Sequence, residues 1–361
     1  MVNMNKFTKK FLLGLVLFIV FMVGLYGFLQ NKKEIVRVKE IELSNVKDFH
    51  LASRTLMAFN GDYLYYFGKD GRVLDRIGIN SKNFKIFFSG DYAFVLDLES
   101  GKINQYDDRG FLIDSFVSPV EVFNIEVQNK NIIIHVKEKD NETLYLRDYE
   151  RELKKIYQTP NYILSFDVKN RENFAVAEIF ADSTGHKSIV KLLRSGKKIE
   201  KTLMNEVVFA LKNLGKYMVF VTDKALYKFD DEDFSEVKIP NVGGVLIDEN
   251  KIYLLHSGIL STYSMGLKET DKLVVAANAD RIEKISGAIY VIGGQDIGGE
   301  LGSRREYYTR FPGEVDKVEI NGLSLATLRN ERLTLYKVIK TRSNPSKGAI
   351  KDIDDAGGKK D

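Results

Sequence analysis

Short β-strand patterns recur along this 361-residue chain, and their repetition constrains its fold more than any other feature. The clearest unit, residues 84–118, reads as four strands, FKIFFS, YAFVLDLE, KINQYDDRG and FLIDSFVS, separated by turn residues. Units of the same order recur at spacings of roughly 34 to 43 residues, the range of four-stranded propeller blades. The pattern therefore predicts a β-propeller. A large β-sandwich or two β domains is the alternative, because alternation alone does not distinguish these folds.

The last unit contains only three strands, at residues 315–321, 323–330 and 332–340. The missing fourth strand is available near the other end of the chain, where residues 35–43 form an isolated alternating pattern. Pairing it with the third strand would close the ring and remove two exposed strand edges. We therefore predict one eight-bladed propeller over residues 34–340. A seven-bladed ring is the alternative if the first or the glycine-rich seventh unit is not a blade.

The N-terminal segment is strongly apolar: residues 11–29 contain no charge and would span about 28 Å as a helix. Lys6, Lys9 and Lys10 precede it, which favours a cytoplasmic N-terminus over residues 1–10. We expect a retained transmembrane helix with the propeller outside the cell membrane. A cleaved signal peptide is the alternative, but its apolar region should be about 7–15 residues long and end in a small-x-small site.

Composition limits the classes of function. The chain carries 54 Lys and Arg against 50 Asp and Glu, a balance that gives no reason to expect a nucleic-acid partner. It has no cysteine, which excludes disulfides, thiolate zinc sites and a cysteine nucleophile. Residues 341–361 lack apolar periodicity and mix charges with glycine, so we expect a disordered tail.

The residues that could carry catalysis or bind a metal are sparse. None of the histidines, His50, His135, His186 and His256, has a metal-ligand spacing, and no Gly-x-Ser-x-Gly turn favours a serine nucleophile. We expect His135 and His256 to be hydrogen-bonded packing residues, and His50 and His186 to be solvated. We therefore expect no catalytic residue, no metal site and no cofactor.

The repeats and the N-terminal segment carry a resemblance. The chain resembles the membrane-anchored, extracytoplasmic β-propeller proteins of Gram-positive bacteria that are grouped as a domain of unknown function, and more distantly quinoprotein-type propellers. The resemblance covers the N-terminal segment and nearly all the repeats, and implies an anchored ring. The chain has no tryptophan, so it lacks both the tryptophan docking motifs of quinoprotein enzymes and the Trp-Asp dipeptide of the commonest propeller repeat.

These features favour a non-enzymatic scaffold or protein-recognition module at the cell envelope, with an envelope protein as its partner. The alternative is an envelope enzyme, or a propeller that binds a small molecule or glycan in its central channel. A cluster of acidic or histidine residues on the inner strands would favour this alternative, but inner strands such as 84–89, 208–213 and 244–249 are chiefly apolar.

The partner is expected on the face that points away from the membrane. That face includes the longest predicted insertion, residues 181–187, between two strands of the fourth unit. Loops of this kind commonly carry binding residues. The candidate partner-binding residues are Tyr162, Asp182, His186 and Lys187.

Overall fold

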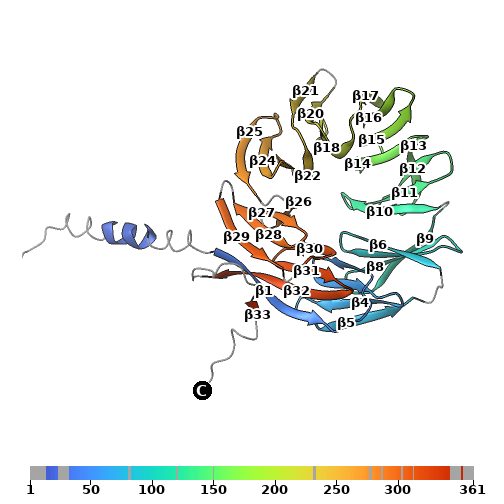
Figure 1. Cartoon of the computed structure of the whole chain (residues 1–361). Helices are drawn as coiled ribbons and strands as arrows, with labels where there is room; N and C mark the ends of the chain where they lie inside the picture. The colour runs from blue at the N-terminus through green and yellow to red at the C-terminus, as the bar shows by residue number, and fades with distance from the viewer. Residues whose placement is uncertain are drawn as a thin grey trace, which may run out of the picture.

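The computed structural model describes residues 14–22, 32–79, 83–118, 121–148, 150–230, 233–275, 279–285, 288–301, 304–311, 313–341 and 351–352. The described strands form eight sheets, which are the blades of a β-propeller around a central opening (Figure 1). The predicted fold class is confirmed. The first and seventh units both form complete four-stranded blades, so the seven-bladed alternative and the β-sandwich are wrong.

Seven blades each consist of four consecutive strands, ordered from the centre outwards. Blades 1 to 4 comprise β2 (Asp48–Leu51), β3 (Thr55–Phe59), β4 (Tyr63–Gly68), β5 (Val73–Gly78); β6 (Phe84–Ser89), β7 (Tyr92–Asp97), β8 (Lys102–Asp107), β9 (Leu112–Val117); β10 (Val122–Gln128), β11 (Asn131–Lys137), β12 (Glu142–Arg147), β13 (Leu153–Thr159); and β14 (Tyr162–Asn170), β15 (Asn173–Asp182), β16 (Gly185–Arg194), β17 (Lys197–Met204). Blades 5 to 7 comprise β18 (Val208–Asn213), β19 (Met218–Thr222), β20 (Ala225–Phe229), β21 (Phe234–Lys238); β22 (Val242–Ile247), β23 (Lys251–His256), β24 (Ile259–Ser264), β25 (Glu269–Val274); and β26 (Ala279–Ile285), β27 (Ala288–Gly293), β28 (Asp296–Leu301), β29 (Arg304–Arg310).

Blade 8 joins both ends of the ring. It comprises β30 (Lys317–Asn321), β31 (Ser324–Arg329), β32 (Arg332–Thr341) and β1 (Lys32–Ile41). Strand β1 pairs antiparallel with β32, which confirms the predicted closure, although β1 starts and ends earlier than the predicted strand 35–43. In addition, β33 (Lys351–Asp352) pairs parallel with β1, so these two residues depart from the expected disordered tail. The tail residues 342–350 and 353–361 lie outside the described residues.

The core lies between the blades, because each sheet packs its two faces on its neighbours. The second strands are therefore the most buried, and all five residues of β19 are buried. Such strands read as continuous apolar runs, whereas outer strands such as β5 and β9 are mostly exposed. Phe94 of blade 2 and Ile134 of blade 3 belong to one of the clusters that fill these interfaces.

The ring has two faces that the topology distinguishes. We call the face on which the chain enters each blade the entry face; it also carries the turns between second and third strands. The opposite face carries the turns between first and second and between third and fourth strands. Strand β1 is a fourth strand and begins on the opposite face, where Lys32 pairs with Thr341.

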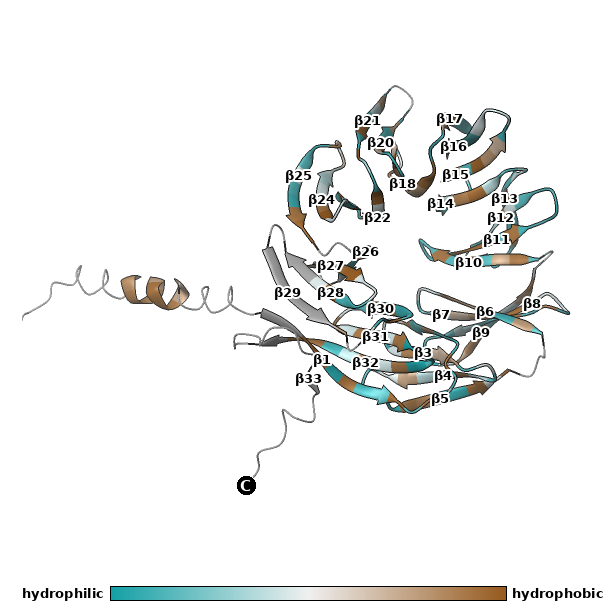
Figure 2. Cartoon of the chain, viewed as in Figure 1, coloured by the Kyte–Doolittle hydropathy of each residue, from teal (hydrophilic) through white to brown (hydrophobic). Residues whose placement is uncertain are grey.

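Residues 14–22 form a helix whose apolar side chains from Leu15 to Met22 are exposed, and Figure 2 shows it as uniformly hydrophobic. The rest of the predicted span, residues 11–13 and 23–29, lies outside the described residues, as do residues 1–10. In the described part of the chain, no helix is long and apolar enough to cross a membrane.

Candidate functional site

Three neighbouring inner strands expose a bulky apolar side chain at the same position, near the entry face. These are Phe123 of β10, Leu164 of β14 and Phe209 of β18, with exposed fractions of 52%, 37% and 46%. Each lies where the register with the second strand shifts, which marks a β-bulge. Because a bulge redirects a side chain away from the regular pleat, its repetition in three blades turns three apolar groups outwards at equivalent positions.

Tyr162, at the start of β14, extends this surface and is 66% exposed. The Lys137 ammonium lies 3.9 Å from the ring centroid of Phe123 and 5.7 Å from that of Tyr162, so the two rings flank one cation across a blade boundary. The equivalent bulge residues in blades 6 and 7 are Gly243 and Asp280, so the apolar series ends there. We call the four exposed residues the apolar arc: Phe123, Tyr162, Leu164 and Phe209.

A buried polar pair, His135 and Glu142, packs against the inner side of the arc. The His135 ring packs edge-on against Phe123, at 5.1 Å between centroids, and its Nε2 lies 2.9 Å from Glu142 Oε2. The same carboxylate oxygen accepts the Ile163 backbone N–H from the next blade at 2.7 Å. Burial lowers the pKa of His135 despite the neighbouring Glu142 carboxylate, so the imidazole is neutral at pH 7. His135 is thus the hydrogen-bonded packing residue that the sequence predicted.

The other predicted partner-binding residues lie at the end of a β-hairpin in blade 4. Strands β15 and β16 pair as far as Asp182 and Gly185, so the predicted insertion 181–187 is wrong: only Ser183 and Thr184 form the turn. The positive φ of 119° at Gly185 permits this tight connection.

Within that hairpin the predicted residues mainly contact each other. The Lys187 ammonium donates to Asp182 Oδ2 at 2.5 Å, and this bond, together with those from the Thr184 hydroxyl and N–H, lowers the pKa of Asp182 to about 2. His186 is half-buried rather than solvated, and its Nε2 is buried without a hydrogen-bond partner. Of the predicted residues, only Tyr162 belongs to the apolar arc.

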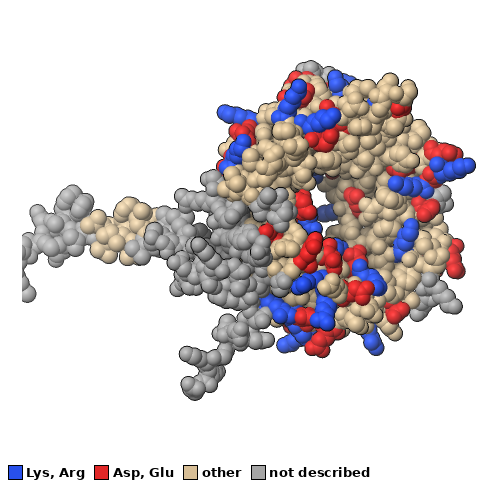
Figure 3. Space-filling model, viewed as in Figure 1, with Lys and Arg blue, Asp and Glu red and all other residues tan. Residues whose placement is uncertain are grey.

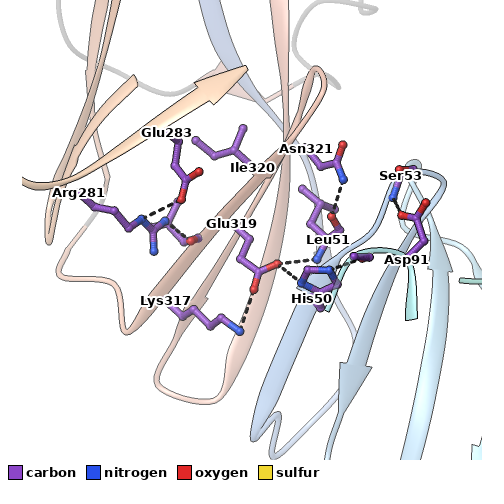
Figure 4. Close-up of a pocket in the computed structure, with 12 residues that line it drawn as sticks. His50, Leu51, Ser53, Asp91, Arg281, Glu283, Lys317, Glu319, Ile320 and Asn321 are labelled. Carbon is purple, nitrogen blue, oxygen red and sulfur yellow. Dashed lines mark hydrogen bonds and ion pairs between the residues drawn. The ribbon is translucent and has the colours of Figure 1, made fainter. Parts of the chain in front are cut away.

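A second candidate site lies in the central channel, where acidic and basic side chains gather beside the opening near β30 (Figure 3). A pocket of about 500 Å³ is lined by residues of β2, β26 and β30. Glu319 lies at its centre: Oε2 accepts from His50 Nδ1 at 2.9 Å and from the Leu51 N–H at 2.7 Å, and Oε1 accepts from Lys317 Nζ at 2.8 Å (Figure 4).

The contacts of His50 fix its charge. Its Nε2 lies 2.7 Å from the Gly90 carbonyl oxygen, so both ring nitrogens face acceptors and the doubly protonated ring satisfies both. Burial alone would lower the pKa of His50, but the hydrogen bond and charge of Glu319, with the Gly90 carbonyl, raise it. Burial likewise opposes ionisation of Glu319, yet His50 and Lys317 bring its pKa down to about 2. The polar atoms of this cluster bind one another and join blade 8 to blade 1.

The sequence patterns did not predict this cluster. His50 was expected to be solvated, which is wrong, since its side chain is only 21% exposed. The inner strands 84–89 and 208–213 are chiefly apolar as noted, but β30 reads KVEIN. Its alternation places Lys317, Glu319 and Asn321 on one side of the strand, and this period-two pattern is the signal that could have revealed the cluster.

The Arg281 and Glu283 side chains, on the pocket wall, make a longer contact with each other than Glu319 makes with its donors. Arg281 Nε lies 3.5 Å from Glu283 Oε1, and the guanidinium also donates to the Val318 carbonyl. Burial raises the pKa of Glu283, and Arg281 only partly offsets this effect. Among the described residues, no group of three His, Cys, Asp or Glu side chains could hold a metal ion.

Comparison with known proteins identifies the fold but no family. No protein-family model matches the chain, and no curated protein matches it. Among solved structures, BamB from Moraxella catarrhalis is similar with a TM-score of 0.54 and 11% identity, over 84% of this chain and 97% of that one. The Pan2 WD40 domain of Neurospora crassa has a TM-score of 0.41 and 11% identity, over 85% and 92% of the two chains. At these identities the similarity to BamB establishes the β-propeller fold alone.

Proposed function

We propose that this chain is a non-enzymatic protein-recognition module, anchored by one N-terminal helix in the cell membrane, whose propeller binds an envelope protein through the apolar arc. The observation that carries the proposal is the exposure of Phe123, Tyr162, Leu164 and Phe209 on three consecutive blades. An apolar surface of this kind is costly in water and is typical of a protein-binding site.

The anchor is supported by the N-terminal segment. Residues 11–29 are uncharged, and the described helix over 14–22 exposes apolar side chains that make no core with the ring. Insertion into a bilayer would remove this surface from water. The lysines before the segment favour a cytoplasmic N-terminus, which would place the propeller outside the membrane.

The arc would then face away from the bilayer. Strand β1 begins on the opposite face of the ring, and only residues 30 and 31 separate it from the predicted span. Two extended residues reach about 7 Å, so the opposite face would lie near the membrane. The entry face, with the apolar arc, would be open to a partner.

Site-specific photocrosslinking in intact cells tests this function. A benzophenone analogue of phenylalanine replaces Phe123, Phe209 or, as the control, Phe111, which is 60% exposed and lies just before the outer strand of blade 2. We expect Phe123 and Phe209 to yield the same protein adduct and Phe111 to yield none of it. Adducts that are identical at all three positions, or absent from both arc positions, would contradict the proposal.

Ligand binding in the channel is the second candidate function. The pocket of about 500 Å³ favours it, because the loosely bonded Arg281 and Glu283 offer a donor and an acceptor to a polar ligand such as a glycan. Thermal shift measurements with glycan and small-molecule collections test it. A ligand that stabilises the chain, but not its Glu283→Gln variant, would support a channel site.

A further inference from the structure

On the opposite face of the ring, basic residues gather on blade 4 and on the first-to-second turns of blades 3 and 5. Its cations lie in or beside the turns 129–130, 171–172, 195–196 and 215–216, where the single carboxylate is Glu172. We call these residues the basic patch: Lys130, Lys169, Arg171, Arg194, Lys197, Lys198 and Lys216.

Contacts between the turns show that the patch is continuous. Asn131 Nδ2, next to Lys130, donates to the Lys169 carbonyl at 3.2 Å across blades 3 and 4. The Arg194 guanidinium donates to the carbonyls of Gly215 and Lys216, at 3.2 and 2.7 Å, across blades 4 and 5.

Few carboxylates compensate this charge. Lys198 pairs with Glu200 at 2.8 Å. Within the described part of the chain, no ion pair involves Lys130, Lys169, Arg171 or Lys216. Two acidic turns flank the patch on the same face. In blade 3, Glu150 and Glu152 are both bound by Lys154, with Asp148 beside them, and in blade 5 the turn after β20 carries Asp230 and Asp233. Within the patch itself the seven cations outnumber the carboxylates of Glu172 and Glu200, so the positive field is centred on blade 4, between the two acidic turns, and attracts an anionic group there.

A groove lies within the patch. It has a volume of about 530 Å³. Its lining includes the apolar side chains of Ile156, Phe174 and Leu193 together with two cations, Arg171 and Lys197, and one carboxylate, Glu172. Cations beside an apolar floor suit a phosphate group attached to an apolar body. That chemistry is found in a lipid headgroup.

We propose that the basic patch binds the anionic headgroups of the same bilayer that holds the N-terminal helix. The inference rests on the proposed anchor, which emerges on the same face at blade 8. In a ring of eight blades, blade 4 lies directly across from blade 8. The helix at one side and the patch at the other therefore hold the opposite face flat on the membrane and present the apolar arc outwards.

The absence of native cysteine allows one label to be placed at either end of blade 4. The full chain is reconstituted in two kinds of vesicle. One contains phosphatidylcholine alone, and in the other phosphatidylglycerol makes up about a third of the lipid. An environment-sensitive fluorophore is attached at Ser195→Cys, in the patch, or at Thr184→Cys, on the entry face. We expect headgroup spin labels to quench the Ser195 label in anionic vesicles only, and not to quench the Thr184 label in either.

Removal of charge provides the specific test. Near an anionic surface each Lys or Arg raises the affinity about fivefold. The triple variant Arg171→Gln, Lys197→Gln and Lys198→Gln should therefore lower the affinity of the patch for anionic lipid by about a hundredfold and abolish the quenching. The control removes three entry-face charges, by Lys102→Gln, Lys139→Gln and Lys238→Gln, and should keep the quenching.

Vesicle flotation separates the two proposals. If the chain floats with neutral and anionic vesicles but the Ser195 label stays unquenched, the lipid-binding patch is wrong and the anchor stands. An acidic protein as the true ligand of the patch would give this same unquenched result. If the chain floats with anionic vesicles only, and the triple variant does not float, the patch is supported and the anchor is wrong.

Discussion

Glu319 of blade 8 accepts hydrogen bonds from two residues of blade 1 and from Lys317 of its own strand, and so joins the last blade to the first. Its carboxylate is 20% exposed and binds His50 and Lys317 as well as the Leu51 N–H. Glu319→Gln would leave the His50 imidazolium without its counterion and Lys317 paired with Asp48 alone, which we expect to cost about 2–4 kcal/mol of unfolding free energy. Urea denaturation of the variant and the parent chain measures this loss. Glu331→Gln, which breaks the exposed pair with Lys47, is the control and should cost below about 1 kcal/mol.

The charge of His50 makes stability depend on pH. Its pKa is raised above the ordinary value of 6.5 in the folded chain, because Glu319 and the Gly90 carbonyl outweigh the effect of burial. The stabilisation is therefore fully present below pH 6.5 and is lost as the pH rises through the folded-state pKa. Unfolding free energy measured from pH 5.5 to about 8.5 should fall over this window. His50→Gln should flatten that fall, and an unchanged slope in the variant would contradict the assignment.

At the scale of residues, the sequence predicted local roles better than distant ones. It identified His135 as a hydrogen-bonded packing residue from the apolar strand around it. It did not identify Glu319 as the partner of His50, because the two residues lie in the last and first blades, far apart in the chain, and meet only after the ring closes. The arc was missed except for Tyr162, since a β-bulge that turns Phe123 outwards has no clear pattern in a single sequence.

At the scale of elements, β1 is the strand on which the ring depends. It buries Ile35, Val36 and Ile41 and covers the edge of β32. Removal of residues 1–41 should cost roughly 5–8 kcal/mol from these side chains alone, which is comparable to the stability of a whole domain. We expect aggregation in light scattering after size-exclusion chromatography. Removal of residues 1–31 keeps β1 and should leave a monodisperse ring; aggregation of both forms alike would contradict this role.

The hairpin of β15 and β16 depends on Gly185. A methyl group there would meet Asn205 Oδ1 at 2.5 Å, in addition to the strain of a φ of +119°. We expect Gly185→Ala to lower the unfolding free energy by about 1–2 kcal/mol. Gly61→Ala is the control, because its φ is +109° but no atom lies within 4 Å of the added methyl group. Equal losses in thermal unfolding would show that the contact with Asn205 is unimportant.

The elements themselves were largely readable from the sequence. Strand alternation and turn residues predicted every blade, and the unpaired strand near the N-terminus predicted how the ring closes. The hairpin of blade 4 was misread as an insertion because Asp182, Ser183 and Thr184 are all residues typical of loops. Whether such residues form a long loop or a two-residue turn depends on how far the flanking strands pair. Here the strands pair as far as Asp182 and Gly185, which leaves a two-residue turn.

At the scale of the whole molecule, the ring separates its charged and apolar surfaces. The apolar arc lies on the entry face over blades 3 to 5, and the basic patch lies on the opposite face of the same blades. A single rigid sheet thus connects the two surfaces in blade 4. Because β1 starts on the same face as the basic patch, both proposals require one orientation of the ring relative to the membrane.

The proposed topology predicts which parts of the molecule are reachable from outside the cell. Thr184, in the blade 4 turn on the entry face, is exposed, and Asn3 precedes the lysines that favour a cytoplasmic N-terminus. In intact cells, a membrane-impermeant maleimide should label Thr184→Cys and leave Asn3→Cys unlabelled, because the bilayer blocks the reagent. Lysis should then expose both, and the cysteine-free parent chain is the background control. Labelling of Asn3→Cys alone in intact cells would show that the orientation is reversed, and labelling of neither would place the propeller inside.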